Sequence, residues 1–236
     1  MENFRQDTGI SPKARALAAQ QLRLWTEPEL LKVGVEKMRN SNAEWDFMAR
    51  SFLVWSLANM SLRDPESRTT YLRTMDQIID ETLQLEKEKG MYFFLMSYAK
   101  PDQYVVQPPH SLFVDGEIAL MLAARRMVEE KTEYKRLLTE RVDAMANRLR
   151  ESPHLILESY PDECWTFDHC VALDAMKMAD CLDGSDHSAL IRDWVAMARE
   201  KLTDPRSGLL VASFTTTGAP LSGPQGSTLW MAAHCL

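Results

Sequence analysis

Residues 159–184 read SYPDECWTFDHCVALDAMKMADCLDG. Polar and reactive side chains crowd the first half of this segment, and small apolar side chains fill most of the second half as far as Gly184. The pattern predicts a buried helix that ends at Gly184 and whose N-terminal end opens onto a cavity. Ionisable groups are favoured at such an end by the helix dipole and by the free backbone N–H groups.

A related pattern lies about 53 residues earlier in the chain. Residues 118–120 correspond to residues 171–173, and each buried helix is followed by a tight turn and an amphipathic helix. Residues 42–89 look like a looser earlier copy, and residues 229–236 begin a later one without a C-cap signal. Repeats of this length are typical of stacked helix pairs. We therefore expect an all-α fold, an α/α toroid or barrel of helical hairpins that is incomplete at its C-terminus.

The expected organisation is an N-terminal helical extension, residues 1–40, packed on a partial barrel, residues 41–236. The helix after Asn42 is apolar around much of its circumference, Trp45 included, and is predicted to be deeply buried. Residues 91–99 fit either a strand or a short buried helix. The glycine-rich loop before the last helix is expected to contain a short hairpin.

Composition restricts the partners and the compartment. The net charge is −7 and the charges of both signs are interspersed, so we expect no nucleic acid partner. No apolar run approaches the roughly 20 residues that span a bilayer, and the N-terminus has no apolar leader, so we expect no membrane association and a cytoplasmic location. The four cysteines lack metal-site spacing and are expected to be free thiols. A homo-oligomer is possible.

In a toroid all inner helices run in the same direction, so the long loops meet at one end. The reactive residues of this sequence lie in or next to those loops, where binding groups usually sit. They are His110, Asp115, Glu117, Asp162, Glu163, Cys164, Asp168, His169, Gln225 and Ser227.

Cys164 follows two carboxylates, which should raise the pKa of its thiol and keep it neutral. A neutral thiol suits proton donation to a leaving hydroxyl better than nucleophilic attack; simple packing is the alternative. His110 could act as acid or base. His169 is next to Asp168, but neighbours in a helix point about 100° apart and need not pair.

Other candidates also have structural interpretations. Asp115 with Glu117, and Asp162 with Glu163, could be helix caps or acid–base groups. Asp46, between Trp45 and Phe47, needs a partner if it is buried. Tyr160, Trp165 and Phe167 could line an apolar pocket or simply pack between helices. No glycine-rich phosphate loop and no metal-ligand spacing is present, so neither a cofactor nor a metal is expected.

Four segments together resemble the linalool dehydratase-isomerase family. They are NAEWDFMARSFLVWSLANMSLR, HSLFVDGEIALMLAARRM, SYPDECWTFDHCVALDAMKMAD and GPQGSTLWMAAHCL. The resemblance implies an α/α barrel and cofactor-free acid–base chemistry on a small apolar alcohol. It also implies that Cys164, His110 and Asp46 are the family's cysteine, histidine and aspartate. Cys170 and His169 complete our candidate catalytic set, while Phe52 stands where the family pattern has a tyrosine.

Three functions follow from these observations. The first is a lyase or isomerase acting on a terpenoid-like alcohol or alkene in an apolar cavity. The second is a carbohydrate-active toroid, a hydrolase or epimerase, in which Asp115 or Glu117 works with Asp162 or Glu163. The third is a non-catalytic helical-repeat domain in which the candidate residues only cap and pack.

Overall fold

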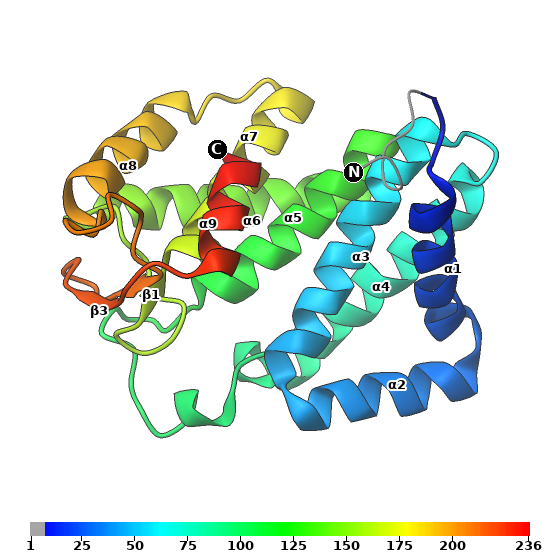
Figure 1. Cartoon of the computed structure of the whole chain (residues 1–236), viewed down its shortest axis with the longest axis horizontal. Helices are drawn as coiled ribbons and strands as arrows, with labels where there is room; N and C mark the ends of the chain where they lie inside the picture. The colour runs from blue at the N-terminus through cyan, green and yellow to red at the C-terminus, as the bar shows by residue number, and fades with distance from the viewer. Residues whose placement is uncertain (1–7) are drawn as a thin grey trace. The chain divides into compact units, whose positions relative to one another are not determined.

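The computed structural model describes residues 8–236, and within them nine α-helices make up most of the regular structure (Figure 1). The predicted all-α class is confirmed. The chain divides into two compact units, one of residues up to Met96 with Ala124–Lys131, the other of Ser97–Ala123 with Thr132–Leu236. The division expected at residue 40 stays a prediction. No helix in residues 8–236 has both the length and the apolar character that crossing a membrane requires.

The helices occur in the order that the sequence predicts. Those of the first unit are α1 (Pro12–Thr26), α2 (Pro28–Ser41), α3 (Ala43–Arg63) and α4 (Arg68–Lys89), followed by a 3₁₀ turn at Met91–Phe93. Those of the second unit are α5 (Leu112–Val128, whose last turn belongs to the first unit), α6 (Thr132–Glu151), α7 (Thr166–Asp183), α8 (Ser188–Lys201) and α9 (Gly226–Cys235), with a 3₁₀ turn at Ser97–Ala99.

Helix α3 forms the centre of the first unit and packs against α2 and α4. The side chain of Asn42 caps it by accepting a hydrogen bond from the Trp45 amide. Phe47, Val54 and Leu57 are fully buried, as expected. Trp45 is 61% exposed, which corrects the prediction that it is buried. Its neighbour Asp46 occupies the inward face, so Trp45, about 100° further around the helix, points outward.

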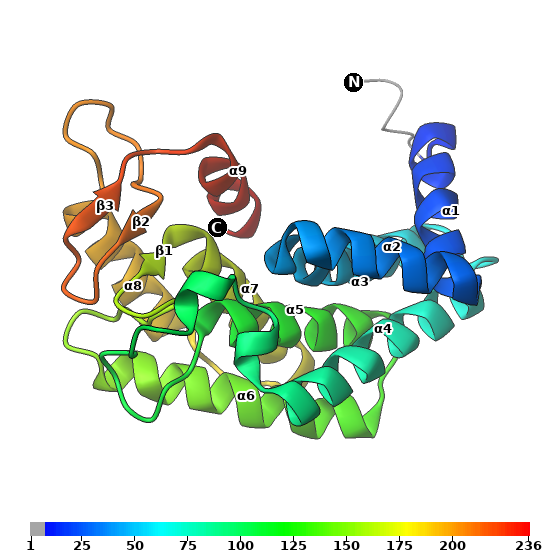
Figure 2. The same cartoon turned by 90° about the horizontal axis from the view of Figure 1, so that it is seen from below.

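Residues 91–99 contain two 3₁₀ turns, so the strand alternative is wrong. The predicted hairpin is confirmed by β2 (Ser213–Phe214) and β3 (Pro220–Ser222). A third strand, β1 (Cys164–Trp165), pairs antiparallel with β2 directly before α7 begins (Figure 2). From the sequence pattern these two residues were expected to lead into a helix, and the strand was not predicted.

Helix α7 is largely buried in the second unit. It packs against α6 and α9, and a Cβ atom added to Gly116 of α5 would lie 3.4 Å from the Cβ atom of Ala172. Gly116 therefore lets α5 approach α7 closely. Gly184, in the left-handed conformation with φ 72°, ends α7 as predicted.

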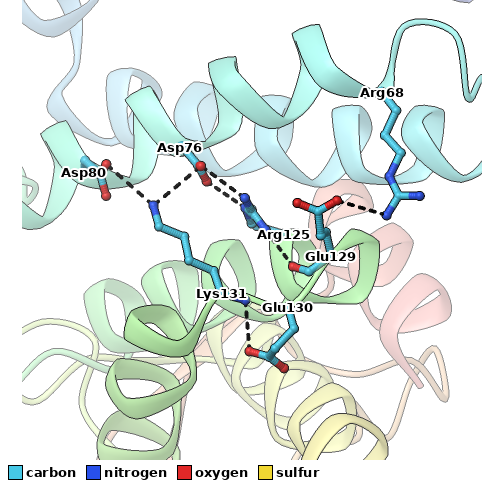
Figure 3. A network of polar contacts seen from close by, with 7 residues as sticks. All are labelled: Arg68, Asp76, Asp80, Arg125, Glu129, Glu130 and Lys131. Atoms are coloured by element: carbon cyan, nitrogen blue, oxygen red, sulfur yellow. Dashed lines mark hydrogen bonds and ion pairs between the residues drawn. The ribbon is translucent and has the colours of Figure 1, made fainter.

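A network of charged side chains joins α4 to the end of α5 in the first unit (Figure 3). The guanidinium of Arg125 donates two hydrogen bonds to Asp76, at 2.6 and 3.1 Å. The ammonium of Lys131 lies 3.5 Å from Asp76 and 3.8 Å from Asp80. The other residues of the network are Arg68, Glu129 and Glu130.

Asp76→Ala is expected to lower the free energy of unfolding by about 2 kcal/mol, because the buried Arg125 loses its carboxylate partner. Asp80→Ala is the matched control, since the side chain of Asp80 is 59% exposed and its contact with Lys131 is long. Urea denaturation of the two variants measures both changes. Equal losses would show that the Arg125–Asp76 pair contributes no more than a surface contact.

Candidate functional site

The segment ahead of α7 makes a tight turn. Tyr160 and Glu163 pair through their backbones, with the Tyr160 amide donating to the Glu163 carbonyl at 3.0 Å and the Glu163 amide to the Tyr160 carbonyl at 2.9 Å. Asp162 has φ 49°, a conformation that aspartate tolerates better than most residues. The turn places Cys164 in β1 and Trp165 just before α7.

Glu158, which the sequence analysis missed, anchors this turn. Its carboxylate accepts hydrogen bonds from the backbone amides of Val105, Val106 and Asp162, at 2.9, 2.8 and 2.7 Å, and the residue is only 1% exposed. An acidic residue directly after the apolar run 155–157 was the available signal. Its donors, however, lie up to 53 residues away, beyond the reach of any local pattern.

His110 is buried in the loop before α5. Its Nδ1 atom lies 3.1 Å from the Pro108 carbonyl, so this nitrogen carries the proton and donates. Its Nε2 atom is buried and has no hydrogen-bond partner among residues 8–236. Burial lowers the pKa of His110, and the charge of Arg148 acts in the same direction. His110 is therefore a neutral imidazole with one nitrogen available.

Cys164 and Cys170 are fully buried thiols. Burial is the main cause that raises the pKa of the Cys164 thiol, and the charges of Glu158 and Asp162 add to it. The pKa of Cys170 is raised to about 12 by burial and by the charges of Asp168 and Asp174. Both thiols therefore stay neutral. The neighbouring carboxylates raise the pKa of Cys164, as expected from the sequence, but burial raises it more.

His169 is enclosed in the second unit. Its Nδ1 atom lies 2.7 Å from the Trp165 carbonyl, and its Nε2 atom accepts the Leu157 amide at 3.1 Å. The ring stacks on Trp194 and lies 5.6 Å from Phe214, centroid to centroid. Burial lowers its pKa to about 4. Both ring nitrogens bond the backbone, an arrangement that favours a structural role over the predicted catalytic one.

Asp174, also missed, lies one turn beyond Cys170 on the same face of α7. Burial raises its pKa to about 6, and the charge of His234 opposes this rise. Desolvation raises the pKa of the partly buried Cys235 thiol, and the charges of Asp174 and Glu117 add to this rise. Residues of α5, α7 and α9 thus form one group of interacting acid–base side chains: Glu117, Cys170, Asp174, His234 and Cys235.

Four of the predicted substrate-binding residues, Tyr160, Glu163, Trp165 and Phe167, lie in the turn or directly after it. Tyr160 is buried and stacks on Tyr98 at 4.9 Å between ring centroids. The indole N–H of Trp165 donates to Glu163 at 2.7 Å, and Phe167 is buried.

Asp115 forms ion pairs with two arginines of α6, Arg141 at 2.5 Å and Arg148 at 3.2 Å. Its carboxylate is therefore already engaged between α5 and α6, whereas Glu117 lies with the acid–base group described above. Asp46 lies in the first unit, where Arg50 donates to it at 3.0 Å and Arg39 lies 3.5 Å away. Asp46 thus has the ionic partners that a buried carboxylate needs.

The structure brings most of the sequence-predicted residues together in the second unit. The charge of Glu158 acts on both His110 and Cys164, and the charge of Asp168 acts on both Cys164 and Cys170. Among residues 8–236 no group of three His, Cys, Asp or Glu side chains is placed to hold a metal ion. The arrangement offers neutral proton donors and weak bases in buried surroundings.

Comparison with known proteins adds no family: no family model matches the sequence, and no curated protein matches it significantly. The resemblance to the linalool dehydratase-isomerase family stays a prediction.

Proposed function

We propose that the second unit carries the acid–base site of a cofactor-free lyase or isomerase. The observation that supports it is a set of proton-exchanging side chains at the start of α7 and along it: the buried thiols of Cys164, in β1 just before the helix, and of Cys170, and the partly buried carboxyl of Asp174. The charge of Glu158 acts on both Cys164 and the buried His110. Such groups suit proton transfer to and from a substrate that brings no charge. The proposed substrate is a small apolar alcohol or alkene of terpenoid type, the class that the family resemblance implies.

The chemistry requires one acid and one base. A neutral thiol, that of Cys164 or Cys170, gives a proton to the leaving hydroxyl; the C–O bond breaks and water departs. A base then takes a proton from the neighbouring carbon, and the electron pair of that C–H bond forms the C=C bond. Asp174 is suited to be the base, because a carboxylate with a pKa of about 6 is ionised at neutral pH yet basic enough to accept a proton.

Turnover of small monoterpene alcohols and alkenes, followed by gas chromatography, tests this function. Asp174→Asn is expected to lower kcat/KM about a hundredfold or more, and so is one of the two variants Cys164→Ala and Cys170→Ala, the one that removes the acid. Cys181→Ala is the matched control, because Cys181 is the exposed cysteine of the same helix. With Asp174 as base, kcat/KM should rise as the pH rises through about 6, and Asp174→Asn should abolish that limb.

Two outcomes would contradict the proposal. If the folded wild-type chain turns over no member of the panel, the terpenoid-type reaction is wrong. If all three variants retain wild-type turnover, the reaction does not use Cys164, Cys170 or Asp174. A parallel sugar panel tests the carbohydrate-active alternative, which the ion pairs of Asp115 with Arg141 and Arg148 make less favourable. A folded chain that binds neither panel would favour a non-catalytic helical-repeat domain.

We also propose that the helix pairs belong to an α/α toroid. Support comes from the alternation within the second unit, in which the buried α7 is followed by the amphipathic α8. The proposed location is the cytoplasm, where four free thiols would stay reduced.

A further inference from the structure

Glu158 is a buried carboxylate that accepts hydrogen bonds from three backbone amides. A carboxylate removed from water is costly unless its oxygens are hydrogen-bonded, and bonds from backbone amides to a charged oxygen are among the stronger ones. One oxygen of Glu158 accepts the amides of Val105 and Asp162, and the other accepts the amide of Val106. A single side chain therefore satisfies donors from two separate loops.

The same two loops are joined by further bonds around Glu158. The Leu112 amide donates to the Glu158 carbonyl at 2.8 Å. The hydroxyls of Tyr104 and Ser111 both donate to the Ser159 carbonyl, at 3.1 and 2.7 Å. Residues 104–112 are thus fixed along residues 158–162 at several points, and the Glu158 carboxylate accepts three of the hydrogen bonds.

We propose that Glu158 is a positioning residue that holds His110 and Cys164 in fixed places. His110 lies within the loop that the carboxylate anchors, and Cys164 follows two residues after Asp162 in the turn that it also anchors. The inference rests on the proposed function only for the acid–base roles of His110 and Cys164. The positioning itself can be measured without any substrate, so its failure is separate from the failure of the proposed reaction.

Amide hydrogen exchange gives the first test. In Glu158→Ala the amides of Val105, Val106 and Asp162 lose their acceptor, and each is expected to exchange about tenfold faster or more. In Glu158→Gln one oxygen is replaced by an NH₂ group, which cannot accept a hydrogen bond from a backbone amide. If the remaining oxygen accepts the amides of Val105 and Asp162, as Oε1 does in the wild type, only the amide of Val106 should exchange faster.

The titration of His110 by NMR gives the second test. The direction in which its pKa changes when Glu158 is replaced distinguishes an effect on the position of the loop from an effect of the carboxylate charge. Burial is the largest influence and lowers the pKa of His110, whereas the negative charge of Glu158 raises it. If Glu158 holds the loop in place, its replacement lets water reach the imidazole and the pKa rises. If Glu158 acts through its charge alone, the pKa falls.

Asp180→Asn is the matched control at the opposite end of α7. Asp180 is also buried and also accepts local bonds, from the His187 amide at 2.8 Å and the Ser185 hydroxyl at 2.9 Å. It should leave the exchange of residues 105 and 106 and the titration of His110 unchanged. Three outcomes would each overturn the proposal. Amide exchange could be unchanged in the Glu158 variants, it could change equally in Asp180→Asn, or the pKa of His110 could fall when Glu158 is replaced.

Discussion

Replacing Asp46 by alanine is expected to lower the free energy of unfolding by about 3–5 kcal/mol, the usual result of breaking a buried ion pair from one side. Arg50 is 2% exposed and is held between Asp46 at 3.0 Å and Glu81 at 3.0 Å. Without Asp46 its guanidinium keeps the ion pair with the partly exposed Glu81, and Arg39 loses its ion pair with Asp46 as well. Chemical denaturation at neutral pH measures the loss.

Two controls decide the interpretation for Asp46. Glu27→Ala removes the acid of an Arg–Glu pair that has the same i,i+4 spacing as Asp46 and Arg50, but this pair is exposed, so the change should be much smaller. The double variant Asp46→Leu with Arg50→Met removes both charges and should recover much of the stability lost in Asp46→Ala. A variant Asp46→Ala that stays fully stable yet loses turnover would instead support the catalytic role predicted from the sequence.

His169 is expected to make the protein less stable in mild acid, by about 3 kcal/mol between pH 7 and pH 4. The folded state holds the pKa of His169 at about 4, below the ordinary value of 6.5, because the ring is buried. Between these pH values the unfolded chain binds the proton and the folded chain does not. Stability is therefore fully present above about pH 6.5 and is lost as the pH falls toward 4.

His169→Gln isolates this contribution. A glutamine amide can donate to the Trp165 carbonyl and accept from the Leu157 amide, as the imidazole does, but it does not titrate in this range. Urea denaturation of both proteins at a series of pH values should show a shallower dependence in the variant. The burial of His110 lowers its pKa too, but this acts equally in both proteins and cancels in the comparison. Parallel curves would contradict the assignment to His169.

Local sequence signals predicted the helices well because each depends on periodicity and on residues at its ends. Gly184 ends α7 with a positive φ, and the apolar run before it is buried, as the pattern indicated. The same reasoning failed at Trp45, since an apolar side chain does not reveal which face of a helix turns inward. It also failed at β1, because two residues carry too little periodicity to indicate a strand.

The sequence alone determined the helical class, the helix order and the gathering of reactive residues around the start of α7, because these follow from short-range pattern. Only the tertiary structure decided what those residues do. Glu158 meets the amides of Val105 and Val106 across more than 50 positions, and Asp174 interacts with His234 of α9. Burial, which decides whether a thiol, an imidazole or a carboxyl is charged, is created only when distant segments exclude water together.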